Sequence, residues 1–146
     1  MSGPAGPAFK QLNLVVSDMD AALAFWRRLG LTPRLTPDGQ HADAELSPGL
    51  DIEWDTAEFA PQWDTSSRGA VAGSLIIGFQ LASREAVDAL YEELTAAGYH
   101  GHQRPYDGFW GARYAIVDDP DGNAAGLMSP VEADRKFWPP TQAPAT

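Results

Sequence analysis

The sequence contains no cysteine, and this absence excludes three kinds of chemistry at once. A disulfide framework, a thiolate metal site and a cysteine nucleophile are all impossible. Basic residues are also scarce: ten Lys and Arg against twenty Asp and Glu give a net charge of −10. Nucleic acids and anionic membranes bind basic surfaces, so we expect neither as a partner. An acidic chain is compatible with a cationic ligand, although most acidic proteins are simply soluble.

Long hydrophobic runs are missing as well. No stretch reaches the roughly 20 apolar residues of a membrane-spanning helix. Residues 1–9 lack the charged start and the apolar run of a secretory signal, so we expect a cytoplasmic location. The chain nevertheless has 146 residues, of which 44% are hydrophobic. That length and composition predict one domain with a substantial core.

The most strongly marked segment is residues 113–128, which reads as strand, tight turn and strand. Ile116 and Val117 give the first strand its β-branched character. Pro120 and Gly122 then supply the backbone angles of a turn. Two strands alone are marginally stable in water, so this hairpin needs neighbours.

The rest of the chain supplies these neighbours as a repeat of the order β-α-β-β-β. Predicted strands cover 9–17, 31–35, 41–46 and 50–55 in the first repeat, and 74–81, 99–104 and the hairpin in the second. Ser17 or Asp18 caps the first predicted helix and Ser83 the second, and Gly30 and Gly98 end them. We therefore expect an α+β fold in which two βαβββ repeats form a mixed, cupped sheet with the helices on its outer face. The expected boundaries are a flexible tail (1–8), one domain (9–130) made of a first repeat (9–56), a linker (57–73) and a second repeat (74–130), and an irregular C-terminal tail (131–146).

Three segments carry a resemblance to a known family: LNLVVSDMDAALAFWRRLGL (12–31), FWGARYAIVDDPDGN (109–123) and GLMSP (126–130). Together with the repeat, they resemble the vicinal oxygen chelate superfamily of glyoxalases, bleomycin-resistance proteins and extradiol dioxygenases. The match is to an actinobacterial-type, glyoxalase-like protein of unassigned substrate. The resemblance implies paired βαβββ modules, commonly in a homodimer.

The resemblance also implies where a divalent metal would be held, by one residue from the first and one from the last strand of each repeat. These positions fall on Gln11, Glu53, Ile76 and Gly126. Gln and Glu can offer oxygen to a hard cation, whereas Ile and Gly have no ligating side chain. We therefore expect no cofactor, with a divalent metal held by Gln11 and Glu53 as the alternative.

Strand alternation predicts which side chains line the cup. Asn13 shares a face with Gln11, and Glu53 lies at the centre of its strand. Asp51 and Asp55 share the face of Glu53, but we expect them at solvated strand ends. We also expect His41, which opens a strand near a turn, to be solvated.

Aromatic residues next to glycines predict a second part of the site. Phe109 and Trp110 could flank the mouth of a pocket and stack on a flat ligand. The alternative is that Trp110 packs in a dimer interface. Met128, on the closing strand, also faces the predicted cup. The predicted ligand contacts are thus Asn13, Glu53, Phe109, Trp110 and Met128.

These residues support two functions of different classes. The first is a metal-independent protein that sequesters an aromatic or cationic small molecule and performs no chemistry. The alternative is a lyase, isomerase or dioxygenase whose metal is held by Gln11 and Glu53, with Glu53 as general base. A third and weaker hypothesis is a metal-free enzyme that uses Glu53 alone. The sequence leaves open whether the protein is an enzyme and what its ligand is.

Overall fold

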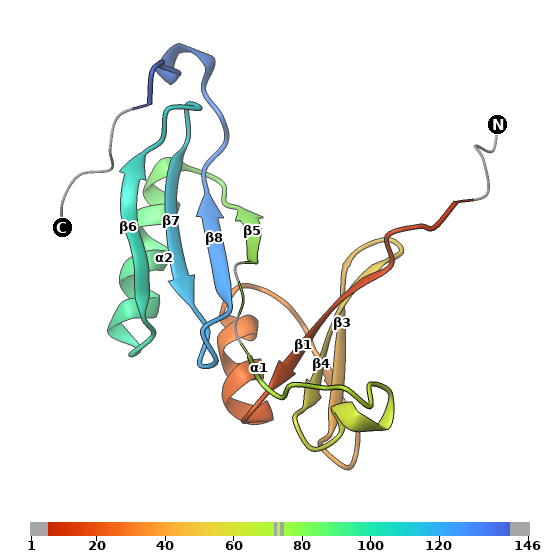
Figure 1. Cartoon of the computed structure of the whole chain (residues 1–146). Coiled ribbons are helices and arrows are strands. Elements are labelled where there is room, and N and C mark those ends of the chain that lie inside the picture. Colours follow the sequence, from red (N-terminus) through yellow and green to blue (C-terminus); the bar gives the residue numbers. More distant parts are fainter. Residues whose placement is uncertain (1–5, 72, 74, 141–146) are drawn as a thin grey trace. The chain divides into compact units, whose positions relative to one another are not determined.

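The structure, a computed structural model, describes residues 6–71, 73 and 75–140. These residues form two compact units, and the division falls between Val71 and Gly73. We call them module one (residues 6–71) and module two (residues 75–140). Each contains one helix and a four-stranded mixed sheet in the order β-α-β-β-β (Figure 1). The α+β class and the paired βαβββ modules are therefore confirmed.

Module one begins with β1 and ends with a short helical turn. Its elements are β1 (Gln11–Val16), α1 (Met19–Arg28), β2 (Arg34–Leu35), β3 (His41–Ser47), β4 (Leu50–Thr56) and the 3-10 turn η1 (Ala60–Gln62). The strand order is β1-β4-β3-β2, with β1 parallel to β4 and the other pairs antiparallel. The Asp18 carboxylate accepts a hydrogen bond of 3.0 Å from the Ala21 N–H, as expected of an N-cap.

The core of module one uses one side of each strand. Leu14 of β1 and Trp54 of β4 are cross-strand neighbours, and both are buried. Helix α1 packs against β4 and buries Phe25 and Trp26. Because side chains alternate along a strand, the residues between these core positions face the other way. That second face carries the polar residues.

Module two repeats the plan. Its elements are β5 (Ile76–Gln80), α2 (Arg84–Ala96), β6 (Gly101–Asp107), β7 (Arg113–Asp118), β8 (Ala124–Met128) and the 3-10 turn η2 (Ala133–Arg135). The strand order is β5-β8-β7-β6, with β5 parallel to β8. Helix α2 covers one face of β6, β7 and β8 (Figure 1), and Ser83 caps it by accepting from the Ala86 N–H. No helix in the described part of the chain is long and apolar enough to cross a membrane.

Strand β6 runs further than predicted. The sequence indicated a strand ending at Arg104 and then a loop, whereas β6 continues to Asp107. Pro105 lies inside it, and the pairing with β7 shifts register between Gln103 and Tyr106. Proline lacks an N–H and is tolerated in edge strands and at such irregularities. Since β6 is the edge of its sheet, Pro105 interrupts the pairing without ending the strand.

The segment after β8 is held against the rest of module two by hydrogen bonds. We call residues 130–138 the strap. The Glu132 N–H donates to the Gly111 carbonyl, and the Phe137 N–H donates to the Phe109 carbonyl, both at 2.9 Å. The part of the predicted tail that lies beyond residue 140 falls outside the described residues.

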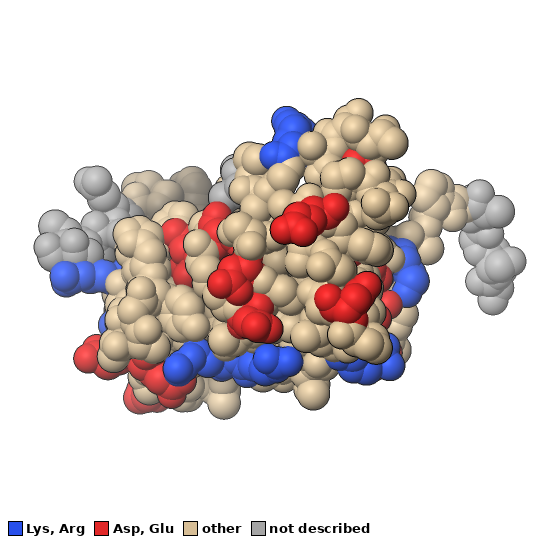
Figure 2. All heavy atoms as spheres, turned by 90° about the horizontal axis from the view of Figure 1, so that it is seen from below, with Lys and Arg blue, Asp and Glu red and all other residues tan. Residues whose placement is uncertain are grey.

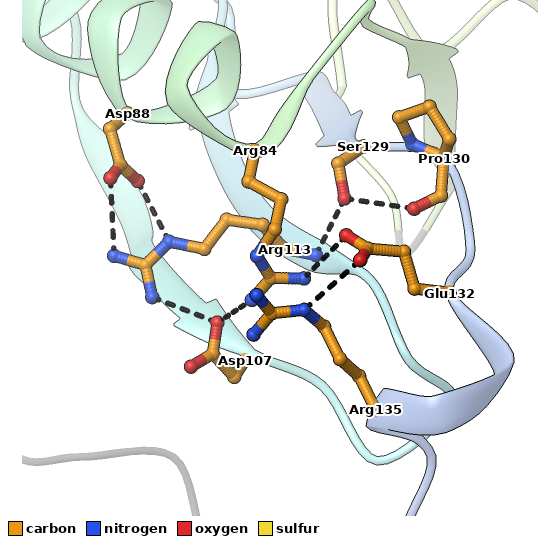
Figure 3. A network of polar contacts seen from close by, with 8 residues as sticks. All are labelled: Arg84, Asp88, Asp107, Arg113, Ser129, Pro130, Glu132 and Arg135. Carbon is orange, nitrogen blue, oxygen red and sulfur yellow. Dashed lines mark hydrogen bonds and ion pairs between the residues drawn. The ribbon is translucent and has the colours of Figure 1, made fainter.

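A network of charges reinforces these backbone bonds (Figure 3). Glu132 of the strap lies 3.8 Å from Arg84 of α2 and 3.2 Å from Arg135. Arg84 also pairs with Asp107, which in turn accepts from Arg113 at 3.2 Å. Hydrogen bonds from Arg113 to Asp88 raise the pKa of that guanidinium. The network therefore joins helix α2, the sheet and the strap.

The strap passes close to Gly111, which lies in the loop before β7, and this contact gives a stability prediction. Its φ is +96°, and a Cβ there would lie 2.4 Å from the Glu132 carbonyl oxygen. We expect Gly111→Ala to lower the free energy of unfolding by about 3 kcal/mol, from left-handed strain and a displaced strap. Urea denaturation followed by circular dichroism measures the loss.

Gly98 provides the matched control. Its φ is +100°, but nothing lies within 4 Å of the position of a Cβ. Gly98→Ala should therefore show the backbone strain alone, about 1 kcal/mol. Equal losses in the two variants would contradict the close approach of the strap at Gly111.

Candidate binding site on module one

Strand register gathers polar side chains on the face of module one opposite Trp54. Asn13 of β1 is the cross-strand partner of Glu53 on β4. On the other side of β4, His41 of β3 is the partner of Asp55. Directly paired residues point to the same face of a sheet, and so do residues two apart on one strand. The four side chains therefore share one surface.

These side chains form a continuous polar chain. The Gln11 Nε2 group donates to Asn13 Oδ1 at 2.6 Å, and the Asn13 Nδ2 group donates to Asp55 Oδ2 at 3.0 Å. The other Asp55 oxygen lies 2.6 Å from His41 Nδ1. His41 Nε2 lies 3.8 Å from Glu53 Oε1. Asp55 thus fixes two neighbours, and the imidazole presents its second nitrogen to Glu53.

The burial of Asp55 differs from what its sequence position predicted. We predicted it at a solvated strand end, but only 1% of it is exposed. A buried carboxylate needs hydrogen-bonding partners to offset its desolvation, and Asn13 and His41 supply them. Asp51, for which the same was predicted, is partly exposed and paired with Lys10 at 2.8 Å.

The environment of His41 also differs from what its sequence position predicted. Instead of being solvated at the start of its strand, its side chain is 27% exposed and bonded to Asp55. A carboxylate acceptor at Nδ1 favours the tautomer with its proton there, which leaves Nε2 as an acceptor when the ring is neutral. His41 is therefore an oriented imidazole on the polar face, and its place at the start of a strand gave no sign of this.

A hollow of about 470 Å³ opens over the polar chain. Its lining consists of Gln11, Asn13, His41, Glu53, Asp55, Phe59 and Trp63. The two aromatic residues come from the segment predicted as a linker, where η1 follows β4. Trp63 is 51% exposed, so much of its ring is open to solvent. The hollow is thus acidic at its floor and aromatic at one wall.

The charges around this hollow are unevenly compensated. Acidic and basic side chains are mixed on the surface that Figure 2 draws, so the net charge alone marks no site. On the polar face, Asp51 pairs with Lys10, and Asp43 pairs with Arg34 at 2.9 Å. Among the described residues, the only group within ion-pair distance of Glu53 is His41. The side chain of Glu53 is 19% exposed, so its carboxylate is sheltered, and no Lys or Arg of the described residues forms an ion pair with it.

The predicted contacts from the second repeat lie on module two. The Trp110 indole N–H donates to the Met128 sulfur at 3.3 Å. Trp110 also meets Tyr114 edge-on, with ring centroids 5.4 Å apart, and Tyr106 completes this aromatic cluster. Burial raises the pKa of Tyr106 and of Tyr114, so both phenols stay protonated at neutral pH. This part of module two is uncharged, unlike the hollow of module one.

The residues at the four expected metal positions do not suit a metal centre. Gly78 pairs with Gly126 in module two as Asn13 pairs with Glu53 in module one, and this register agrees with the correspondence that the resemblance implies. A Cβ at Gly126 would lie only 2.7 Å from the Tyr114 hydroxyl, so a phenol fills the space beside it. Within the described residues, no group of three or more His, Asp or Glu side chains could hold a metal ion. Glu53 and the Gln11 amide are the only donors at these positions.

Comparisons with known proteins place these features in a family. A family model described as the glyoxalase/bleomycin resistance protein/dioxygenase superfamily matches residues 8–127. A search of curated proteins finds no match. Among solved structures, a glyoxalase/bleomycin resistance protein/dioxygenase from Nocardioides is 26% identical, with a TM-score of 0.68. The similarity covers 89% of this chain and 87% of that one.

Two further structures share the fold at lower identity. A glyoxalase-related enzyme from Fulvimarina pelagi is 19% identical with a TM-score of 0.75, over 94% of this chain and 99% of that one. A lactoylglutathione lyase from Agrobacterium tumefaciens is 19% identical with a TM-score of 0.63, over 86% and 95% of the two chains. At these identities the likeness concerns the fold alone.

Proposed function

Because the chain belongs to the glyoxalase/bleomycin resistance protein/dioxygenase superfamily, we propose that it is a small-molecule-binding protein that holds a cationic organic compound in the hollow of module one. The proposed ligand carries an ammonium or amidinium group beside a flat apolar part. Binding requires no metal, and the protein performs no chemistry on the ligand.

The observation that carries this proposal is the state of Glu53. Its carboxylate is sheltered, lines the hollow, and has only His41 within ion-pair distance among the described residues. A cation bound there would meet a carboxylate that no Lys or Arg of the described residues pairs with directly. Charge-assisted hydrogen bonds to a carboxylate are among the stronger polar contacts in proteins.

The aromatic wall supports the same class of ligand. Phe59 and Trp63 line the hollow beside the carboxylates. The faces of such rings attract cations through their quadrupoles, and Trp does so most strongly. Asn13, whose amide is held by Gln11 and Asp55, would fix the orientation of a polar group on the ligand.

The alternative function, a metal-dependent lyase, isomerase or dioxygenase using Gln11 and Glu53, has less support. Module two offers Ile76 and Gly126 at the matching positions, and neither has a ligating side chain. One carboxylate and one amide oxygen are a poor set for a divalent ion. The homodimer and the ligand contacts of Phe109, Trp110 and Met128 stay predictions.

Glu53→Gln tests the proposal. Benzamidine, which is protonated at neutral pH and can donate N–H hydrogen bonds to a carboxylate, serves as the cationic probe, and benzamide is its neutral analogue. We expect wild-type protein dialysed against EDTA to bind the cation, and Glu53→Gln to weaken that binding by about tenfold or more, as for the loss of a charge-assisted contact. Isothermal titration calorimetry measures the cation, and quenching of tryptophan fluorescence compares both probes.

Glu45→Gln is the control, because it removes an exposed carboxylate of β3 that does not line this hollow. It should leave the affinity unchanged. Equal affinity for the cation and its neutral analogue would overturn the proposal, as would an unchanged affinity in Glu53→Gln. Binding of the probe only after a divalent metal is added would favour the enzyme alternative instead.

A further inference from the structure

Module two carries a hollow of its own, and its lining includes no residue of the polar chain. It measures about 580 Å³. Its lining consists of Phe109, Trp110, Val131, Lys136, Phe137 and Trp138. We propose that this hollow, which we call the strap groove, is a second ligand site and that it takes a flat aromatic anion such as an aryl carboxylate.

The aromatic rings of the strap groove leave surface available for stacking. Phe109 meets Trp110 edge-on at a centroid distance of 5.3 Å and Trp138 at 5.5 Å. Such edge contacts occupy only part of each ring. Trp138 is 76% exposed, and Phe109 is 37% exposed. A planar ligand can therefore pack against rings that other aromatic rings already hold in place.

The groove is also held in shape before any ligand arrives. One wall is the strap, which the Phe137 N–H fastens to the Phe109 carbonyl. The ion pair between Glu132 and Arg84 joins the same segment to α2, and the pair between Glu132 and Arg135 lies within the strap (Figure 3). Binding to a site that is already ordered loses less conformational entropy than binding to a loose tail.

The positive charge of Lys136 is the reason that we expect an anionic ligand. Among the residues that the structure describes, Lys136 is the only charged one that lines the groove, and its stem packs over Gly111. No ion pair of the described residues includes Lys136, while the nearby carboxylate of Glu132 is already paired with Arg84 and Arg135. An anion in the groove would meet a free ammonium group and no competing carboxylate from the lining.

The size and chemistry of the groove favour a small molecule over a protein partner. Its volume lies in the range of ordinary ligand pockets, about 300–1,000 Å³. Its preference is also opposite to that of module one, where the hollow is lined by Glu53 and Asp55. The two sites would therefore select ligands of opposite charge.

The test uses 2-naphthoate as the probe and 2-naphthamide as its neutral analogue, with the full chain and isothermal titration calorimetry. We expect wild-type protein to bind the carboxylate more tightly than the amide. Lys136→Glu should weaken naphthoate binding by about tenfold or more, because it replaces an attractive charge with a repulsive one. Trp138→Ala should weaken both probes, since it removes stacking surface.

Lys10→Glu is the matched control. It makes the same charge change at the only other lysine of the chain, on module one. It should leave naphthoate binding unchanged, and so should Glu53→Gln, which separates this site from the cation site. Undetectable binding of naphthoate, or equal weakening by the two lysine variants, would overturn the proposal.

The remaining occupant to test is a second copy of the chain. Light scattering of wild type and Trp138→Ala across a range of protein concentrations measures it. If the wild type is a dimer and Trp138→Ala is a monomer, the groove is an interface and the ligand proposal is wrong. If the two share one oligomeric state, the Lys136→Glu result stands as the decisive one.

Discussion

Replacing Asp55 by alanine should lower the free energy of unfolding by about 3 kcal/mol, because two partly buried donors lose the acceptor on which they converge. The carboxylate is almost fully buried, with Asn13 on one oxygen and His41 on the other. Removing it also leaves a cavity on the floor of the hollow. We further expect His41 to lose its fixed orientation and the cationic probe to bind more weakly. Urea denaturation measures the first effect, and calorimetry the second.

Asp55→Asn separates shape from charge at the same position. The amide oxygen can accept from Asn13, and the amide nitrogen can donate to His41 if the imidazole changes its tautomer. We therefore expect a much smaller loss, about 1 kcal/mol, as for one weakened hydrogen bond. If Asp55→Ala were as stable as the wild type, the polar chain would not be part of the stable structure of module one.

Trp54→Ala should lower the free energy of unfolding by about 4 kcal/mol, which is typical of a buried tryptophan replaced by alanine. Trp54 is fully buried on the core side of β4. It is the cross-strand partner of Leu14 on β1, so the cavity would open where these two strands meet. Urea denaturation followed by circular dichroism measures the loss.

Trp54→Phe separates the contribution of apolar packing at this position from that of the indole N–H. The Trp54 indole N–H is buried and has no hydrogen-bond partner among the described residues, which is itself unfavourable. Phenylalanine removes that unpaired donor while it keeps most of the apolar surface. We expect a loss of less than about 2 kcal/mol, well below that of alanine. A phenylalanine variant as unstable as the alanine variant would indicate that the N–H is bonded in solution.

The helix caps and the β-α-β-β-β order of elements along the chain could be predicted because they rest on local chemistry. Ser83 and Asp18 cap the helices as their side chains suggest. Asn13 and Glu53 were expected on one face, and the parallel register brings them together as cross-strand neighbours. Alternation along a strand is a short-range property, so it can be read without knowledge of the rest of the fold.

The face on which His41 lies could not be predicted, because it depends on a one-residue shift in the register between β3 and β4. An unbroken hairpin starting from the Ser47–Leu50 pair would set His41 opposite Thr56, on the wrong face. The ladder instead shifts between Glu45 and Ser47, so His41 is opposite Asp55. A slip of one residue turns every side chain to the other face of a sheet. A bulge of this kind has no strong sequence signal, although bulges are common beside functional sites.

Contacts between segments that are distant in the sequence could not be predicted either. Nothing local connects Arg84 of α2 with Glu132 of the strap, since their pairing depends on how the strap packs against the loop before β7. The burial of Asp55 likewise depends on two partners from other strands. Side chains that meet only through tertiary structure leave no periodic pattern to read.

The parallel pairing of β1 with β4 also determines when in folding the hollow comes into being. Asn13 and Asp55 are 42 residues apart, and the strands that bear them are the first and last of module one. A helix and two strands lie between them in the sequence, so the chain must close a long loop before the two residues can meet. Such distant pairings form slowly. A ligand that contacts both residues therefore has no binding site early in folding, before β1 and β4 have paired. Its stabilisation would therefore appear mainly as slower unfolding rather than as faster folding.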